Sequence, residues 1–238
     1  MVHVEHLSKH YGKLVALDGF SIEVPRGEIL ALVGPNGAGK TTALKLMVGL
    51  LSPTTGRVSI AGFDVHRQPL EAKRFLSFIP DQPFVYEQLT VAELLGFLGG
   101  VYRMEPTVVD QRARSLLELF GLDGFFSQRI GQLSYGMRSR VVLIASLLHD
   151  PQVLLMDEPF FGLDPHTLRL MKRFLLERAH AGMTVILSTH QLGIVEDVAH
   201  RIAVLAHGRL LALGSMEALK QQHGDHRLEE LFFHLTGS

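Results

Sequence analysis

The chain has 238 residues, enough for one large domain or two small ones, and a chain of this size buries about 70% of its unfolded surface. Its 23 lysines and arginines nearly balance 24 aspartates and glutamates, so the formal net charge of −1 excludes a global basic field for nucleic acid or anionic lipid. The absence of cysteine excludes disulfides and thiolate metal sites and suits a reducing compartment.

Apolar stretches are frequent but short. The longest, such as residues 141–148 and 153–156, fall far short of the roughly 20 residues that a bilayer span needs, and we interpret them as buried core. The first seven residues alternate polar and apolar side chains like a strand, so no secretory signal is visible and synthesis in the cytoplasm is expected.

Short apolar or β-branched runs, separated by turns that contain glycine, predict a series of strands. The predicted strands cover residues 21–24, 29–33, 57–60, 75–79, 153–156, 184–187, 202–205 and 210–213. Helical patterns lie between several of them, and this alternation is typical of the α/β class.

A glycine-rich loop follows the predicted strand 29–33 and precedes an apparent helix. The loop and the first helical residues are Gly34, Pro35, Asn36, Gly37, Ala38, Gly39, Lys40, Thr41 and Thr42. Glycines let the backbone curl so that successive N–H groups point at phosphate oxygens, and the helix N-terminus adds positive partial charge. Lys40 supplies a full charge, and the Thr41 hydroxyl can hold Mg²⁺. The sequence therefore predicts a nucleoside triphosphate site.

Strand signals vanish in the middle of the chain. A capping box that begins at Thr90, followed by apolar residues at helical spacing up to Val101, predicts one helix. Further helices are predicted over residues 106–119 and 134–149. We therefore expect residues 84–150 to form an α-helical subdomain inserted within an α/β core.

Two carboxylates, Asp157 and Glu158, follow the predicted strand 153–156. In parallel sheets, ligands bind outside the carboxyl ends of the strands. Beside a phosphate loop, we expect Asp157 to share Mg²⁺ with Thr41, and Glu158 to orient or deprotonate the water that attacks the γ-phosphate. Taken alone, such a pair is more often a solvated turn, so this interpretation depends on the loop.

The pattern at the end of the chain predicts secondary structure but contains no catalytic or binding motif. The polar residues 220–225 have the composition of a hinge, and a short terminal helix is predicted over residues 226–235. The expected C-terminal helical tail covers residues 221–238. No repeats or long linkers are present, so residues 1–238 are expected to form one unit.

Three further residues give no indication of function when each is considered alone. Tyr11 is near the N-terminus, Gln82 directly follows the strand at residues 75–80, and His190 leaves the end of the strand 184–187. Any one of them would ordinarily be read as a common polar or aromatic residue.

Together, however, these motifs follow the order found in ABC-type ATP-binding cassettes, and the chain resembles that family over nearly its whole length. The matching motifs, in chain order, are the phosphate loop, Gln82, residues 133–137, Asp157-Glu158, residues 162–165 and His190. The resemblance implies a P-loop NTPase core of ABC ATPase type, with the inserted helical subdomain and an antiparallel β edge. It also implies ATP and Mg²⁺ as cofactors.

The resemblance implies a role for several residues. Tyr11 would stack on adenine, Gln82 would contact Mg²⁺ and sense the γ-phosphate, and His190 would hold the γ-phosphate. Lys40 and Glu158 would complete the catalytic set. Asp164 would lie at a dimer interface.

The signature Leu133-Ser134-Tyr135-Gly136-Met137 departs from the usual Leu-Ser-Gly-Gly-Gln of the family. Tyrosine replaces the first glycine, and methionine replaces the glutamine. Ser134 is well placed to cap the helix that follows, and that helix start, with Gly136, would meet a γ-phosphate held by a second protomer. From the residues alone, a plain helix cap explains Ser134 equally well.

By resemblance, two cassettes, as a homodimer or a pair, close head to tail around two MgATP. GTP is disfavoured because the guanine-reading Asn-Lys-x-Asp motif is impossible when Asn36 is the only asparagine. We expect an ATPase subunit of a membrane transporter, and the sequence is similar to bacterial export and drug-efflux cassettes. The alternative is a soluble ABC ATPase acting on nucleic acid or ribosomes, but such proteins generally carry a coiled-coil insertion or two linked cassettes, so no nucleic-acid partner is expected.

A transport role requires a separate transmembrane permease, and the expected location is cytoplasmic, peripheral on the cytoplasmic face of the membrane. The docking surface is expected beside Gln82, where apolar side chains are offered by Phe84, Val85, Tyr86, Leu89 and Phe97. For Leu89 and Phe97, packing into the helical core is at least as good an explanation.

Overall fold

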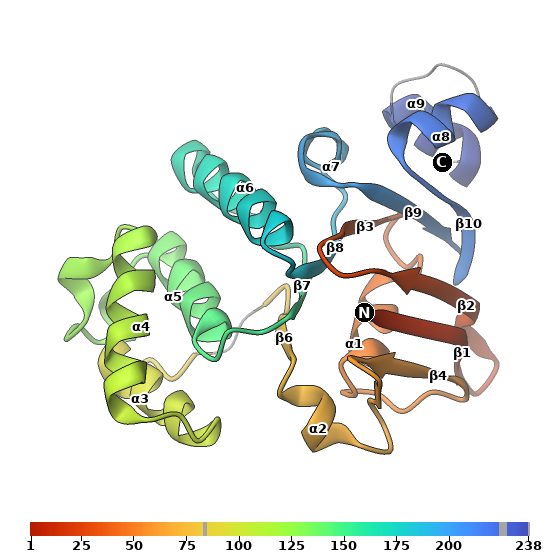
Figure 1. The fold of residues 1–238 in the computed structure, drawn as a ribbon. Coiled ribbons are helices and arrows are strands. Elements are labelled where there is room, and N and C mark those ends of the chain that lie inside the picture. Colours follow the sequence, from red (N-terminus) through yellow and green to blue (C-terminus); the bar gives the residue numbers. More distant parts are fainter. Residues whose placement is uncertain (83–84, 224–227, 238) are drawn as a thin grey trace.

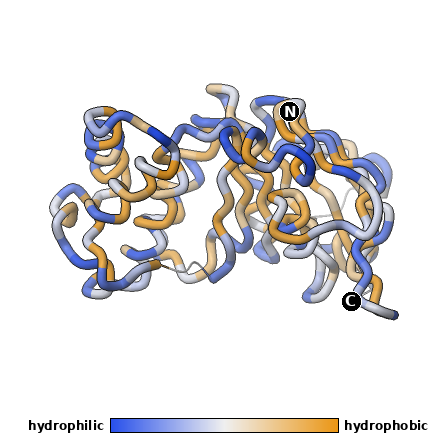
Figure 2. The backbone as a smooth tube through the Cα atoms, turned by 90° about the horizontal axis from the view of Figure 1, so that it is seen from below, coloured by the Kyte–Doolittle hydropathy of each residue, from blue (hydrophilic) through white to orange (hydrophobic). Residues whose placement is uncertain are grey.

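The computed structural model describes residues 1–82, 85–223 and 228–237. These residues form two β-sheets and surrounding helices, which confirms the α/β class (Figure 1). Figure 2 shows hydrophobic segments along the strands in the middle of the molecule and hydrophilic ones mainly in the connections. Among the residues described, no helix combines the length and apolar character that a bilayer span requires.

The larger sheet has six strands in the order β10-β9-β3-β8-β7-β6. They are β3 (Ile29–Val33), β6 (Leu76–Ile79), β7 (Val153–Asp157), β8 (Thr184–Ser188), β9 (Arg201–Ala206) and β10 (Arg209–Gly214). All neighbours are parallel except β10, which pairs antiparallel with β9. The central strands β3, β7 and β8 are buried at every residue, which explains their continuous apolar runs.

The smaller sheet is antiparallel, with the order β2-β1-β4-β5. Its strands are β1 (Val2–Tyr11), β2 (Leu14–Val24), β4 (Thr55–Ile60) and β5 (Phe63–Asp64). The expected antiparallel β structure is thus confirmed, as a sheet of its own and as the edge strand β10. Helix α1 (Lys40–Met47) packs between the two sheets in one hydrophobic core.

Alternation along β3 divides the interior between two cores. Leu30 and Leu32 face the core that contains α1 and the smaller sheet, whereas Ile29, Ala31 and Val33 face the second core. The second core includes residues of α6 (Pro165–His180) and α7 (Leu192–Val198). The phosphate loop, which follows β3 directly, is therefore anchored in both.

Three helices gather at one end of the molecule, beyond β6 (Figure 1). They are α3 (Val91–Val101), α4 (Pro106–Leu119) and α5 (Tyr135–Leu147), and short 3₁₀ turns at Asp123–Phe125 and Ile130–Gln132 connect α4 to α5. The capping box of α3 is confirmed: Thr90 Oγ1 accepts from the Glu93 N–H at 3.1 Å, and Glu93 Oε2 accepts from the Thr90 N–H at 2.8 Å. The helical subdomain at 84–150, the single cassette at 1–238 and the tail at 221–238 stay predictions.

The predicted hinge at residues 220–225 is wrong where the structure describes it. Residues 220–223 belong to α8 (Met216–His223), and the rest of the stretch lies outside the described residues. Leu219 is fully buried, while Gln221 and Gln222 face solvent, so the polar run is the outer face of a helix. The terminal helix follows as α9 (Leu228–Thr236), and α2 (Pro69–Lys73) precedes β6.

Candidate active site

The predicted phosphate loop connects β3 to α1, and its backbone requires glycine. Gly37 and Gly39 have φ values of 80° and 104°, in the left-handed region. A Cβ atom at Gly34 would collide with the Leu205 carbonyl oxygen, and one at Gly39 would collide with the Ala16 carbonyl oxygen. The loop is therefore held tightly against β9 and β2 at the N-terminus of α1, where an anion is favoured.

A pocket of about 330 Å³ lies over this loop. Its lining comes from four parts of the chain: Leu14, Val15 and Ala16; Asn36, Gly37, Ala38, Gly39, Lys40, Thr41 and Thr42; Asp81; and Asp157 and Glu158. The structure thus brings the predicted lysine, both threonines and both carboxylates together.

Lys40 is a largely buried cation at this pocket. Its Nζ donates to the carbonyl oxygens of Gly34 at 2.6 Å and Pro35 at 3.2 Å. Burial lowers the pKa of Lys40, while the negative charges of Glu158 and Asp157 act in the opposite direction. The two carboxylates therefore partly offset the cost of holding an ammonium group away from water.

Asp157 fits a divalent cation. The residue is 2% exposed, and the Ser188 hydroxyl donates to its Oδ1. Its Oδ2 is buried and has no hydrogen-bond partner among the described residues, an arrangement that is costly unless a ligand completes it. Carboxylate oxygens are the ligands that Mg²⁺ prefers, and Thr41 shares the same pocket, so the donor set suits this ion.

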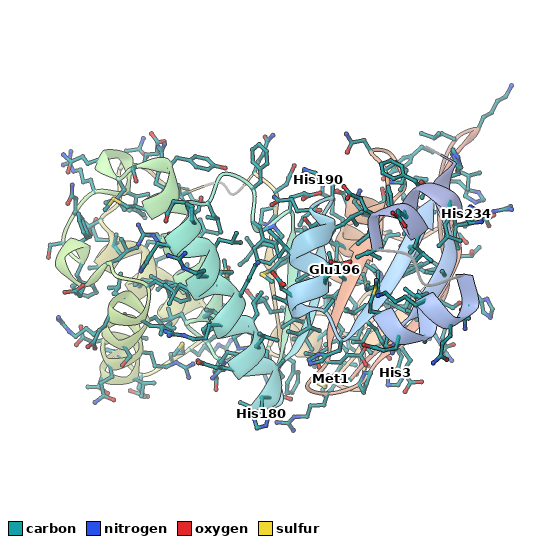
Figure 3. All side chains as sticks on the ribbon, turned by 90° about the horizontal axis from the view of Figure 1, so that it is seen from above. Met1, His3, His180, His190, Glu196 and His234 are labelled. Carbon is teal, nitrogen blue, oxygen red and sulfur yellow. The ribbon has the colours of Figure 1, made fainter. Side chains whose placement is uncertain are left out.

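Glu158 and His190 form a pair. Glu158 adopts φ 48°, a left-handed conformation that is unfavourable for this residue type. Its Oε1 lies 3.0 Å from His190 Nδ1, and its Oε2 accepts from the His190 N–H at 3.4 Å. His190 stands just before α7, half exposed and outside the pocket lining (Figure 3). The pair fixes the direction of a carboxylate at the edge of the pocket.

Two predicted site residues lie beside the pocket rather than in it. Tyr11 ends β1 and pairs with Leu14 across the hairpin, and Lys9 Nζ lies 5.1 Å from the centre of its half-exposed ring. Gln82 lines a neighbouring pocket with Tyr135 and Val85. The structure therefore does not bring Gln82 to the phosphate loop with Thr41 and Asp157. Asp81, which we did not single out from the sequence, is there instead.

Ser134 and Asp164 cap helices, and neither of them nor Gly136 lines the phosphate pocket. Ser134 Oγ accepts from the Met137 N–H at 3.3 Å at the start of α5, and a Cβ at Gly136 would meet open space. Asp164 caps α6, and a hydrogen bond from the Thr167 hydroxyl, with backbone N–H groups, lowers its pKa to about 2. None of the three lines the phosphate pocket of its own chain.

Three of the residues expected to dock a partner, Val85, Tyr86 and Phe97, line a groove of about 380 Å³ beside β6. Tyr86 and Phe97 line it with 52% and 57% of their surface exposed. Val85 also lines the groove but, like Leu89, packs against the hydrophobic core. Core packing thus accounts for Leu89 but not for Phe97, and Phe84 lies outside the described residues.

A glycine-dependent phosphate loop, a buried lysine and carboxylates at the ends of parallel strands define a P-loop nucleoside triphosphatase. A family model described as ABC transporter matches residues 17–161, and the chain belongs to this family. It is an ATP-binding and ATP-hydrolysing subunit of the ABC transporter type.

Curated relatives match nearly the whole chain. The Nod factor export ATP-binding protein I of Rhizobium sp. (strain N33) is 37% identical over 95% of this chain and 74% of its own length. The linearmycin resistance ATP-binding protein LnrL of Bacillus subtilis (strain 168) is 32% identical over 97% of this chain and 74% of its own. The chain spans only 41% of the probable multidrug ABC transporter ATP-binding protein YbhF of Escherichia coli (strain K12), at 34% identity.

Solved structures share the fold. A structure described as the ATP-binding subunit of an ABC transporter superposes with a TM-score of 0.93 at 32% identity, covering 99% of both chains. A nucleotide-free ATP-binding cassette from an ABC transporter gives a TM-score of 0.83 at 26% identity, covering 98% of both.

Proposed function

We propose that the chain powers a bacterial-type exporter from the cytoplasmic face of the membrane, bound to a separate permease, by hydrolysing ATP. The observation that carries the ATPase site is Oδ2 of Asp157, which is buried beside Lys40 in the pocket over the phosphate loop and has no hydrogen-bond partner in the described part of the chain. Relatives named for Nod factor export, linearmycin resistance and daunorubicin resistance support the export direction.

The residues at and beside the pocket then divide the catalytic tasks among them. The loop N–H groups and Lys40 would offset the charge of the phosphates, and Thr41 and Asp157 would hold Mg²⁺. When bound, Mg²⁺ supplies further positive charge at the phosphate oxygens. Glu158 polarises the attacking water, and His190 keeps that carboxylate aligned and contacts the γ-phosphate.

The site is proposed to be completed by a second cassette. Ser134 and Gly136 lie outside the pocket lining of their own chain, while the α5 N-terminus that they form suits a phosphate. Two chains arranged head to tail would bring each α5 to the phosphate loop of the other, with Asp164 near the contact. Tyr11, next to Leu14 at the pocket wall, would stack on the adenine.

The experiment uses Glu158→Gln. This variant keeps the shape of the side chain but removes the base, so we expect ATP turnover to fall by about 10² to 10⁴-fold. ATP binding remains, so the molecular mass should double with MgATP and stay doubled. Light scattering during size-exclusion chromatography measures the mass, and a coupled assay measures turnover. Normal turnover would remove Glu158 from the base role.

Ser134→Arg is the matched control, placed in the Glu158→Gln background. An arginine at the start of α5 would obstruct the phosphate contact made by a second chain, whereas the phosphate pocket of its own chain is unaltered. We expect a monomer with MgATP but unchanged ATP binding. Persistent dimers in this double variant would contradict the head-to-tail arrangement.

A further inference from the structure

Tyr135, the residue that replaces the first glycine of the signature, contacts a second loop of its own chain. Tyr135 is the first residue of α5. A Cβ atom on Gly162 would lie only 3.0 Å from Cε1 and 3.7 Å from Cδ1 of the Tyr135 ring. The edge of the ring therefore lies against the Gly162 backbone, at a distance that leaves no room for a side chain.

The loop beneath this ring begins at Glu158 and ends at Asp164, the cap of α6. It is tightly turned, because the Glu158 carbonyl oxygen accepts from the Phe161 N–H at 3.2 Å. Gly162 has φ 72°, in the left-handed region that favours glycine. The space that a side chain at Gly162 would occupy is filled by the Tyr135 ring instead.

A small cavity also joins Tyr135 to Glu158. Both residues line this cavity of about 40 Å³, a volume that holds no more than a few water molecules, so α5 and the loop approach closely here. The Tyr135 side chain nevertheless keeps 50% of its surface exposed. Burial in the core therefore does not account for an aromatic residue at this position.

Glu158 needs restraint from its surroundings. Its φ of 48° is unfavourable for a residue with a side chain, and such a conformation persists only where neighbouring groups hold it. His190 contacts the carboxylate itself, and the Glu158 N–H donates to the Ser188 carbonyl oxygen at 3.0 Å. The contact of Tyr135 with Gly162 restrains the same loop from the side of α5.

We propose that Tyr135 is a positioning residue for Glu158: its ring braces the loop 158–164 against α5 and so keeps the carboxylate in the direction that activation of water requires. The proposal rests on the role of Glu158 in the proposed function. The start of α5 is also the seat proposed for the phosphate of a second chain. A movement of α5 on binding that phosphate would therefore reach the Glu158 loop of the same chain.

The test compares steady-state and single-turnover ATP hydrolysis by variants of the full chain. Tyr135→Ala removes the ring but keeps a good helix former at the start of α5, and Tyr135→Phe keeps the ring without the hydroxyl. Phe233→Ala is the matched control, because Phe233 is an aromatic residue of similar exposure, 54%, on α9 and does not line the cavity. Equal thermal midpoints verify that the variants are folded.

We expect Tyr135→Ala to lower kcat and the single-turnover rate together by about tenfold, because a misdirected carboxylate slows the chemical step. KM for ATP should stay within about twofold, since the phosphate loop is unaltered. Tyr135→Phe and Phe233→Ala should both keep kcat within about twofold of the unaltered protein. With MgATP, Tyr135→Ala in the Glu158→Gln background should still double in mass.

Gly162→Ala tests the contact itself. Its Cβ would displace the ring, so kcat should fall here too. Because both substitutions remove the same brace, adding Gly162→Ala to Tyr135→Ala should lower kcat by less than about twofold more.

Three outcomes would overturn the proposal. Unchanged turnover in Tyr135→Ala would remove Tyr135 and leave Glu158 in its role. Independent effects of Gly162→Ala and Tyr135→Ala, which multiply in the double variant, would show that the ring does not act through the loop. Loss of the dimer in Tyr135→Ala with Glu158→Gln would place Tyr135 at the contact between chains. Normal turnover in Glu158→Gln alone would instead overturn the function proposed for Glu158, and the role of Tyr135 with it.

Discussion

Asp164 shows how a single cap makes stability depend on pH. The Thr167 hydroxyl and the backbone N–H groups of Thr167 and His166 all donate to its carboxylate, and its pKa falls from 3.8 to about 2. Because the native state binds the proton less tightly than the unfolded state, the charge stabilises the fold above pH 4. That stabilisation is lost as the pH falls toward 2.

We predict that Asp164→Asn lowers the urea midpoint at pH 7 and that the difference from the unaltered protein shrinks steadily below pH 4. Asparagine is also a good helix cap, so the comparison isolates the charge. Urea unfolding followed by circular dichroism at several pH values measures the difference. A gap that stays constant from pH 7 to pH 3 would show that the charge of Asp164 does not stabilise α6.

Individual residues also show which parts of the candidate site can be predicted from the sequence alone. Asp157 and Glu158 were identifiable because a phosphate loop gives meaning to a pair of carboxylates after an apolar strand. Asp81 and Gln82 were not distinguishable in this way, because they are neighbours just after a strand and the direction of each side chain is set by the turn. Only the structure shows that Asp81 shares the pocket with Lys40.

Among the elements, α3 and α4 meet at a glycine. A Cβ atom on Gly99 would collide with the Val109 side chain, whereas one on Gly100, the next residue of the same helix, would meet nothing within 4 Å. Valine in a helix is confined to few rotamers and has little room to move aside. Close approach of the two helices therefore depends on Gly99 and not on Gly100.

We predict that Gly99→Ala destabilises the protein by about 1–3 kcal/mol through overpacking. Gly100→Ala, with open space and a helical backbone, should stabilise it by up to about 1 kcal/mol. Chemical denaturation of both variants measures the two changes. Similar effects of the two substitutions would mean that α3 and α4 can separate at no cost.

The element boundaries were predictable where local signals were strong. The capping box at Thr90 marks the start of α3, and Pro106 marks the start of α4. By contrast, the helical conformation of residues 220–223 in α8 was not predicted, because a helix that exposes a wide polar face shows little apolar periodicity. The tertiary packing of Leu219, which is fully buried, holds that helix in place.

At the scale of the whole molecule, β6 connects the groove to the phosphate pocket. Leu76 and Phe78 line the groove, and Asp81, three residues after Phe78, lines the pocket. A partner helix seated in the groove would press on β6, the strand that leads to Asp81. Occupation of the groove and the state of the nucleotide are therefore expected to influence each other.

We predict that Tyr86→Glu abolishes co-purification with the membrane permease while turnover of the isolated chain stays within about twofold, because Tyr86 lines the groove and not the phosphate pocket. Leu211→Glu is the control, since Leu211 is an exposed apolar residue on β10, at the opposite edge of the sheet. Equal membrane association of the two variants would count against docking at the groove.

In the head-to-tail dimer proposed above, Ser134 serves the phosphate pocket of the other chain, so two different inactive variants are expected to complement each other. Ser134→Arg leaves Lys40 intact, and Lys40→Ala leaves Ser134 intact, so a mixed dimer contains one site with both halves sound. Each variant alone should be inactive, whereas an equal mixture should recover at most about a quarter of full turnover. At most half of the dimers are mixed, each has one good site, and the introduced arginine still obstructs the other contact of the pair. In a cell, this would be recognised as complementation between two mutant alleles of one gene.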